Sequence, residues 1–249
     1  MPMGICKLCL LYKELRDSHL MARSLYKRAR GSGKKGNQDP YLMKKEGGRQ
    51  SSYQITDYVF CADCEDRFNK NGEAYALRFV TKQNGEFPLL DMLGSVSPTM
   101  SGPDWKGWSI ADTSDIDREK IAYFAISVFW RASIHTWKQK DNEAVKIELG
   151  TKYNEEIRRY LLGETCVPPN SSLIVTVCSD TLNKISFFTP QENQKVKDRS
   201  FVFIARGLMF RFRVSNQLVG YERRLSVVNN KTGLITVRDC SKRPIWQLG

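Results

Sequence analysis

The chain has 249 residues, 41% of them hydrophobic and 27% charged, and a net charge of +12, which fits an ordinary globular protein and excludes a miniprotein. The composition also excludes an integral membrane protein, because the most apolar run, residues 121–130, has only ten residues and charged flanks. The first residues lack the basic start and apolar run of a secretion signal, so we expect a cytoplasmic protein.

The first recognisable segment, residues 5–20 (ICKLCLLYKELRDSHL), has short apolar runs broken by polar residues, a pattern that predicts a hairpin or knuckle. Residues 24–30 (SLYKRAR) predict a short basic helix that leads into a loop rich in glycine and lysine. Residues 53–60 (YQITDYVF) are β-branched and aromatic and predict a strand. A helix is expected to begin near Cys64, with Asn71 and Gly72 as a point of interruption.

These segments carry two C-x-x-C pairs, Cys6 with Cys9 and Cys61 with Cys64, separated by 51 residues. A C-x-x-C turn lets two sulfurs converge on one ion, and two such pairs supply the four ligands of a tetrahedral structural zinc site. In a reducing compartment these pairs indicate a metal rather than disulfides, and a redox dithiol is the weaker alternative. We interpret the three remaining cysteines as buried core thiols; they are Cys166, Cys178 and Cys240.

Residues 82–114 are rich in Gly, Pro and Ser, show no period and predict an irregular connection. The densest apolar pattern follows, and Ser114 stands in capping-box spacing to Asp117 at its start, so we expect the longest helix there. A second helix is expected to end at Gly163 in a left-handed C-cap. Short β-branched or aromatic runs then predict an antiparallel sheet; they are SLIVTVCS, KISFFT, SFVFIARGLMFRFRVS, RRLSVVNN and GLITVRD.

Three stretches, ICKLC, RDSHLM and ITDYVFCADCEDRFN, resemble the ββα-metal, or HNH, nuclease finger in the variant held together by four cysteine ligands. In that variant a strand with an aspartate-histidine step follows the first pair, and a histidine follows the second pair at the start of a helix. SHLMARSLYKR, DYVFCADCEDRFNKNGE and FAISVFWRAS also resemble bacterial HNH-like proteins. The finger covers about the first third of the chain, and the wider resemblance reaches the middle helix.

Pattern and resemblance together imply an α+β fold with an N-terminal treble-clef, or ββα-metal, zinc finger, central helices and a C-terminal antiparallel β-sheet. The expected units are the finger with its basic loop at 1–81, the irregular connection at 82–114, the helical segment at 115–165 and the antiparallel β region at 170–249.

The resemblance implies phosphodiester hydrolysis in which His19 is the general base and a Mg²⁺ or Mn²⁺ ion stabilises charge on the phosphate. Ser18 stands where the family has its metal-binding aspartate, and Glu65 stands where it has the final histidine. Glu65 with Asp57 or Asp17 is therefore the implied ligand set for that ion.

Each of these residues also has a structural interpretation. Glu65 can interact with the positive end of the helix dipole, and His19 can complete a hydrogen-bond network beneath the finger. Thr56 or Asp57 stands near the family's orienting asparagine. His135 is interpreted as a core or boundary residue.

The distribution of charge along the chain indicates the kind of partner that it binds. Residues 13–50 have a net charge of +7, and residues 195–249 have a net charge of +9. Two basic ends indicate an anionic partner, most often nucleic acid. The candidate phosphate contacts on the basic helix and loop are Arg23, Lys27, Arg28, Arg30, Lys34 and Lys35. A solvated basic face without a partner is the alternative.

Two functions are compatible with this sequence. The first is a nucleic-acid-binding, HNH-like endonuclease held together by structural zinc. The second is a non-catalytic nucleic-acid or protein-binding module in a larger bacterial or phage-defence assembly. Neither reading involves a membrane.

Overall fold

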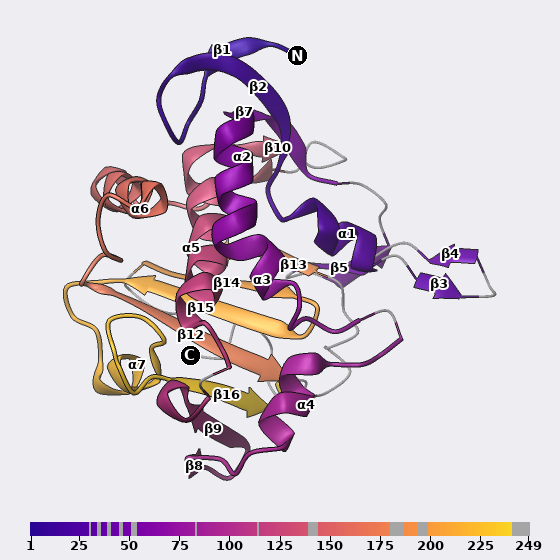
Figure 1. Ribbon diagram of the computed structural model, residues 1–249, viewed down its shortest axis with the longest axis vertical. Helices are drawn as coiled ribbons and strands as arrows, with labels where there is room; N and C mark the ends of the chain where they lie inside the picture. The colour runs from indigo at the N-terminus through magenta and orange to yellow at the C-terminus, as the bar shows by residue number, and fades with distance from the viewer. Residues whose placement is uncertain are drawn as a thin grey trace.

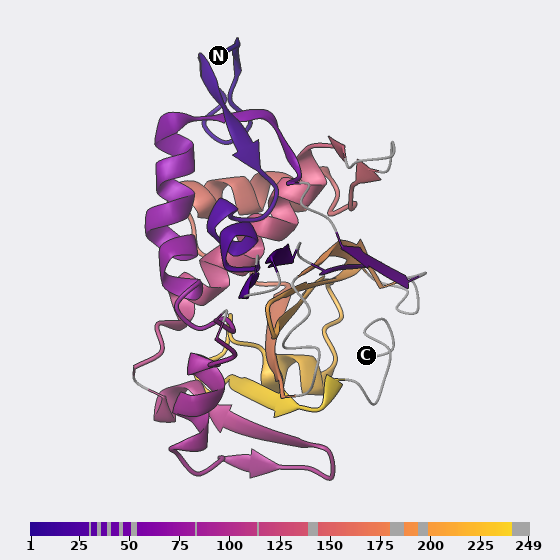
Figure 2. The ribbon, with the colours of Figure 1, turned by 90° about the vertical axis from the view of Figure 1, so that its right-hand side faces the viewer.

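The computed structural model describes residues 1–29, 31–33, 36–38, 41–44, 47–50, 54–82, 84–113, 115–138, 144–179, 187–193 and 199–240, with side chains left out of the description at 28–29 and 31–50. Mixed helices and sheets confirm the predicted α+β class. A small sheet lies at one end of the long axis, and a helical layer covers one face of a larger sheet (Figures 1 and 2).

The small sheet has three antiparallel strands in the order β1 (Met3–Ile5), β2 (Tyr12–His19) and β7 (Thr56–Cys61). Between β2 and β7 lies α1 (Arg23–Ala29), the predicted basic helix. The strand ending at Cys61 is also present as predicted. Strands β3 (Gly31–Gly33) and β4 (Gly36–Gln38) pair with each other in the loop after α1.

A helical run follows β7 directly and confirms both the predicted helix and its interruption. It consists of α2 (Ala62–Phe68), a π-helical turn η1 (Asn69–Glu73) and α3 (Ala74–Ala76). Gly72 lies in the π turn, where an added Cβ would stand 2.7 Å from the backbone N of Phe124. Only glycine lets this turn approach the long helix so closely.

The large sheet has nine strands. In pairing order they are β6 (Gly47–Gln50), β5 (Tyr41–Lys44), β13 (Phe187–Glu192), β14 (Arg199–Ala205), β15 (Leu208–Val214), β12 (Ser171–Cys178), β16 (Leu234–Arg238), β9 (Trp105–Ser109) and β8 (Met100–Ser101). All neighbours are antiparallel except β12 with β16 and β13 with β5. Two strands from the segment between the cysteine pairs therefore extend the C-terminal sheet.

The core lies between this sheet and α5 (Arg118–Ile134), the predicted longest helix. The helix is buried on almost all sides, as its dense apolar sequence requires. Phe129 stacks on Phe212 with ring centroids 5.5 Å apart, and Phe124 meets Phe210 edge-on at 5.7 Å. Within the described part of the chain, no helix combines the length and the apolar character needed to cross a membrane.

The remaining elements surround these layers. They are α4 (Pro88–Gly94), the 3₁₀ helix η2 (Ile110–Asp112), β10 (Trp137–Lys138), β11 (Ala144–Val145), α6 (Thr151–Leu162) and α7 (Gly220–Leu225). The apolar stripe of α6 is buried, and Gly163 ends that helix with φ 78° and ψ 17°, the predicted left-handed cap.

Three local predictions differ from the structure. The N-cap of α5 is Asp117, whose side chain accepts a hydrogen bond from the N–H of Lys120, and Ser114 lies outside the described residues. Residues 223–230 were predicted to form a strand, but the first of them belong to helix α7. The side chain of Glu222 caps the first turn of that helix. Residues 82–114, predicted to be irregular, contain α4, β8 and β9.

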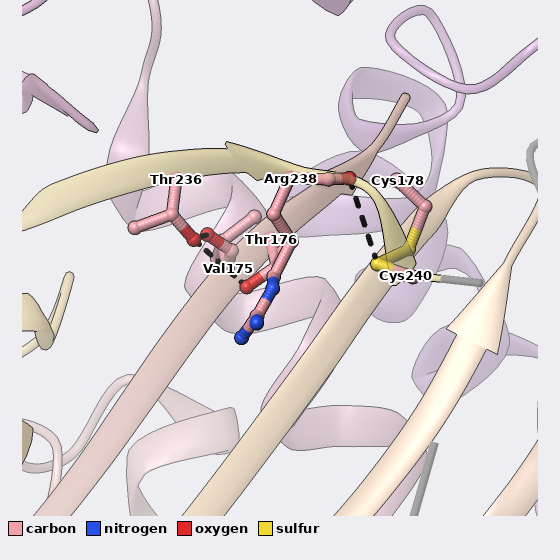
Figure 3. Close-up of a disulfide and its surroundings, with 6 residues drawn as sticks. All are labelled: Val175, Thr176, Cys178, Thr236, Arg238 and Cys240. Atoms are coloured by element: carbon pink, nitrogen blue, oxygen red, sulfur yellow. Dashed lines mark hydrogen bonds between the residues drawn. A yellow bond between two sulfur atoms is a disulfide. The ribbon is translucent and has the colours of Figure 1, made fainter. Parts of the chain in front are cut away.

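The prediction of three buried core thiols was wrong for Cys166, and for Cys178 and Cys240 it was right about burial but wrong about free thiols. Cys166 is exposed, and Cys178 and Cys240 form a disulfide. Their pairing follows from topology, because β12 and β16 run parallel and Cys178 lies opposite Arg238, two residues before Cys240 (Figure 3). The two cysteines are 62 positions apart, and this distance conceals their pairing in the sequence.

Candidate metal centre

Four cysteine sulfurs gather at the end of the small sheet. The Sγ atoms of Cys6, Cys9, Cys61 and Cys64 all lie within 4.8 Å of one another. Those of Cys9 and Cys61 are 3.9 Å apart. A tetrahedral zinc ion with bonds of about 2.3 Å holds its sulfurs about 3.8 Å apart. Donor type and spacing therefore fit a structural metal such as zinc, and the predicted convergence of the two pairs is confirmed.

Backbone hydrogen bonds close the turn that presents the first pair. The Leu10 N–H donates to the Cys6 carbonyl at 2.9 Å, and the Cys6 N–H donates to the Leu11 carbonyl at 3.0 Å. Leu10 has φ 61°, a left-handed conformation that costs a leucine about 1–2 kcal/mol. The N–H of Cys61 approaches the Cys6 sulfur at 3.4 Å, so the second pair is oriented toward the first.

Two positively charged side chains lie near the cluster. Lys13 and Arg158 are both close enough to interact with charge on Cys9. A hydrogen bond from the Cys64 thiol lowers the pKa of Cys6, the same contact raises the pKa of Cys64, and burial raises the pKa of Cys61. The sulfurs thus share protons, and a metal ion that binds all four must displace them.

A buried ionic cluster lies where the resemblance would put a catalytic cation. Ser18 is fully buried; its hydroxyl donates to the Arg16 carbonyl at 3.3 Å, accepts the Phe60 N–H at 3.1 Å, and is close enough to Glu65 to lower the pKa of that carboxyl. The guanidinium of Arg131, on α5, is 1% exposed and donates to Glu73 Oε1 at 2.7 Å. It also lies 4.0 Å from the centre of the Phe68 ring.

These residues do not fit a hydrated divalent cation. Burial raises the pKa of Glu65, which disfavours its charged form, although Arg131 acts in the opposite sense. The guanidinium of Arg131 already supplies the positive charge that a cation would bring, and Ser18 has no negative charge with which to bind a cation. Magnesium needs near-octahedral oxygen ligands and retains several waters, which this closed site does not offer. Glu65 Oε1, buried and without a hydrogen-bond partner among the described residues, belongs to this closed cluster.

His19 projects from the other face of the small sheet. Ser18 pairs with Asp57 and His19 with Thr56, and successive residues of a strand point to opposite faces. His19 Nε2 lies 2.8 Å from Gln54 Oε1, and its ring centroid lies 6.1 Å from that of Tyr26 on α1. Sequence reasoning missed Gln54, which orients His19 in place of the expected Thr56 or Asp57.

The two aspartates also lie on different faces. Asp57 shares the face of Ser18, and its Oδ2 is 2.9 Å from His135 Nε2. Partial burial raises the pKa of Asp57, but the bonds from His135 and the Tyr58 N–H outweigh it, so the net shift is downward. Asp17 is exposed on the face of His19. The structure therefore brings Glu65 and Asp57 to one side of the sheet and His19 and Asp17 to the other.

Part of the predicted basic surface is visible. On α1, Arg23 and Lys27 are exposed one turn apart, while Leu25 and Tyr26 face the core. Arg30, Lys34 and Lys35 lie outside the described residues, as does the side chain of Arg28.

Comparisons with protein-family models, curated proteins and solved structures find no match to this chain. Of the features on which the resemblance to HNH fingers rests, the structure supports the four-cysteine cluster.

A proton titration tests the environment of His19. Burial lowers the pKa of His19, and the hydrogen bond to Gln54 partly opposes that shift. We expect NMR titration to give a pKa below the ordinary value of about 6.5, and a still lower one in Gln54→Leu. Because the unfolded chain then binds the proton more tightly, His19 lowers stability as the pH falls below about 6.5. A His135→Gln variant leaves one imidazole signal, and a pKa at or above the ordinary value would contradict this description.

Proposed function

We propose that this chain is a zinc-stabilised, HNH-like protein that binds nucleic acid. The observation that supports the proposal most is the four-cysteine cluster, which joins the turn between β1 and β2 to the end of β7 and the start of α2. Through that arrangement Arg23 and Lys27 are presented on the exposed side of α1, next to the end of β2. The net charge of +12 favours a polyanion as the partner.

Electrostatic contact with phosphates would supply the affinity of this surface. Lys and Arg side chains release counterions when they neutralise phosphates, so binding weakens as salt concentration rises. The exposed pair on α1 lies four residues apart, a spacing that aligns both charges along one side of a helix. Contacts of this kind recognise the phosphate backbone and do not distinguish one base sequence from another.

Binding can be measured by fluorescence anisotropy with labelled DNA and RNA at several salt concentrations. A double variant, Arg23→Glu with Lys27→Glu, should bind weakly, and the slope of log K against log salt should fall by roughly 0.9 per lost duplex phosphate contact. Lys152→Glu changes an exposed lysine on a different helix, α6, and should bind as the unchanged chain does. Equal losses in both variants would refute the assignment of this surface.

Hydrolysis of a phosphodiester, with His19 as general base, is the second candidate. The observation that favours it is the pairing of His19 with Gln54, which fixes the ring, while burial keeps the imidazole neutral near pH 7. A neutral, oriented imidazole can take a proton from water. The buried Glu65 cluster supports the opposite outcome, a finger that binds without cutting.

A cleavage assay separates the two candidates. Plasmid and RNA are incubated with the chain in added Mg²⁺, in added Mn²⁺ and without either ion. Cleavage that is lost in His19→Ala, with zinc content and unfolding temperature unchanged, would establish the hydrolytic role. Binding without cleavage would leave the non-catalytic module, and cleavage unaffected by His19→Ala would remove His19 from the chemistry.

The four reduced cysteines of the cluster favour a reducing compartment such as the cytoplasm, whereas the Cys178–Cys240 disulfide is more typical of an oxidising one. A protein partner in a larger assembly belongs with the non-catalytic candidate, and co-purification under native conditions tests it.

A further inference from the structure

An open cavity of about 730 Å³ lies between the start of α5, the end of α6 and the segment 227–231. Its volume falls within the range of small-molecule sites. Thr165 and Lys231 in its lining are exposed, so the cavity opens to solvent. None of the described residues that line it belongs to the four-cysteine cluster or to α1. The cavity is therefore separate from the surface assigned to nucleic acid above.

Part of the lining is aromatic and apolar. The rings of Tyr123 on α5 and Tyr160 on α6 lie 5.8 Å apart at an angle of 50°. The hydroxyl of Tyr123 donates to the Leu161 carbonyl at 2.8 Å, which holds that ring in place. Val167 and Val227 add apolar surface. A lining of this kind suits a flat ring, because aromatic side chains stack on planar ligands.

Two positively charged side chains also line the cavity, and neither forms an ion pair with a described residue. They are Arg118, in the first turn of α5, and Lys231. Arg118 Nη1 donates at 3.0 Å to the carbonyl of Asn230, so the guanidinium lies beside the loop that carries Lys231. The amide of Asn230 donates to the carbonyls of Arg223 and Arg224 at 2.8 and 3.1 Å, which fixes this loop. Two cations on adjoining segments suit an anionic group such as phosphate.

The acidic residues of the lining do not neutralise these two cations. Asp117 Oδ2 lies 3.5 Å from the ammonium of Lys120, and Asp117 Oδ1 accepts the Lys120 N–H at 3.1 Å, so these two residues balance each other. Glu119 is exposed and forms no ion pair within the described part of the chain. Its charge acts on Tyr160, which belongs to α6 and not to the loop of Lys231.

Tyr160 and Glu119 supply the polar groups near the aromatic surface. The Tyr160 hydroxyl forms no hydrogen bond with a described residue, although its ring is largely buried. Burial raises the pKa of Tyr160, and Glu119 acts in the same direction, so the phenol stays protonated. The phenol can donate a hydrogen bond to a ligand, and the carboxylate can accept N–H groups.

We propose that this cavity binds a nucleotide. The phosphate contacts Arg118 and Lys231, and the base packs on the rings of Tyr123 and Tyr160. At the edge of the base, the Tyr160 hydroxyl donates a hydrogen bond and Glu119 accepts one from an N–H group. Stacking on aromatic rings together with hydrogen bonds to the base edge is how proteins bind single nucleotides that are not base-paired.

Isothermal titration calorimetry with the four ribonucleoside 5′-monophosphates tests this site in the full chain. At least one of them should bind, and its nucleoside and inorganic phosphate should each bind at least tenfold more weakly, because each lacks one of the two sets of contacts. Binding by none of the four, or equal binding by the nucleoside, would overturn the proposal.

Two variants locate the binding in the cavity. Lys231→Glu should weaken binding of the monophosphate about tenfold, because it puts a negative charge beside the phosphate. Tyr160→Phe removes only the hydroxyl and should weaken binding about fivefold. Lys106→Glu and Tyr221→Phe change exposed residues that do not line the cavity and should bind as the unchanged chain does. Undiminished binding in Lys231→Glu, with an unchanged unfolding temperature, would overturn the assignment.

A free nucleotide and one nucleotide of a strand offer the cavity the same chemistry. If a single-stranded oligonucleotide displaces the monophosphate from the unchanged chain, a strand is the source, and if it does not, the ligand is a free nucleotide. The double variant Arg23→Glu with Lys27→Glu alters α1 alone and should bind the monophosphate normally. Failure of the α1 surface is therefore distinguishable from failure of the cavity.

Discussion

Removal of the metal from the four-cysteine cluster is expected to unfold the N-terminal unit. The three small strands and the first turn of α2 meet at the cluster, and six large apolar side chains among the first twelve residues face solvent instead of packing in the core. Structural zinc contributes on the order of 10 kcal/mol to small domains at neutral pH. Elemental analysis should find one zinc per chain, and a strong chelator should lower the thermal unfolding temperature markedly.

Two cysteine variants make this prediction specific. Cys64→Ser removes a buried ligand and should lose zinc and the fold of the finger. Cys166→Ser changes a cysteine that is exposed and outside the cluster, so zinc content and unfolding temperature should stay as they are. If the two variants behave alike, the cluster does not hold the metal.

The second large effect is expected at Arg131. Replacing it with methionine leaves Glu73, whose side chain is only 12% exposed, without its partner and removes the donor that reaches the His19 carbonyl at 3.3 Å. Breaking a buried ion pair by removing one partner costs on the order of 3–5 kcal/mol. Chemical denaturation followed by circular dichroism measures this loss.

A double-mutant cycle separates charge from packing. If the cost comes from the unpaired carboxylate, then Arg131→Met combined with Glu73→Gln should cost clearly less than the sum of the single changes. Lys82→Met breaks a pair of similar length, 2.7 Å to Glu86, but both side chains are about half exposed, so only a small change is expected. An equally small loss in Arg131→Met would contradict the role of this guanidinium.

Local sequence patterns predicted much of the finger. The two C-x-x-C pairs identified all four members of the cluster, because their spacing is a property of adjacent residues. Strand β7, the basic helix α1 and the glycine cap of α6 also follow from short-range rules of residue type and period.

The contacts that decide the chemistry are long-range, and the sequence did not indicate them. Gln54 is 35 residues from His19, and Arg131 is 58 residues from Glu73. The resemblance placed Glu65 beside a metal ion, whereas the fold packs it against α5. Such pairings depend on how helices pack on sheets, which the periodicity of a single segment does not specify.

The pairing of β5 with β13 has a consequence for the order in which the chain folds. Leu42 lies beside Phe187, and Met43 lies beside Phe188. During synthesis the cysteine cluster is complete once residue 64 has emerged, long before the ribosome reaches β13. If a metal binds at that stage, it closes the segment between the two cysteine pairs while one side of β5 is still unpaired, so nascent chains of intermediate length would expose that edge to chaperones.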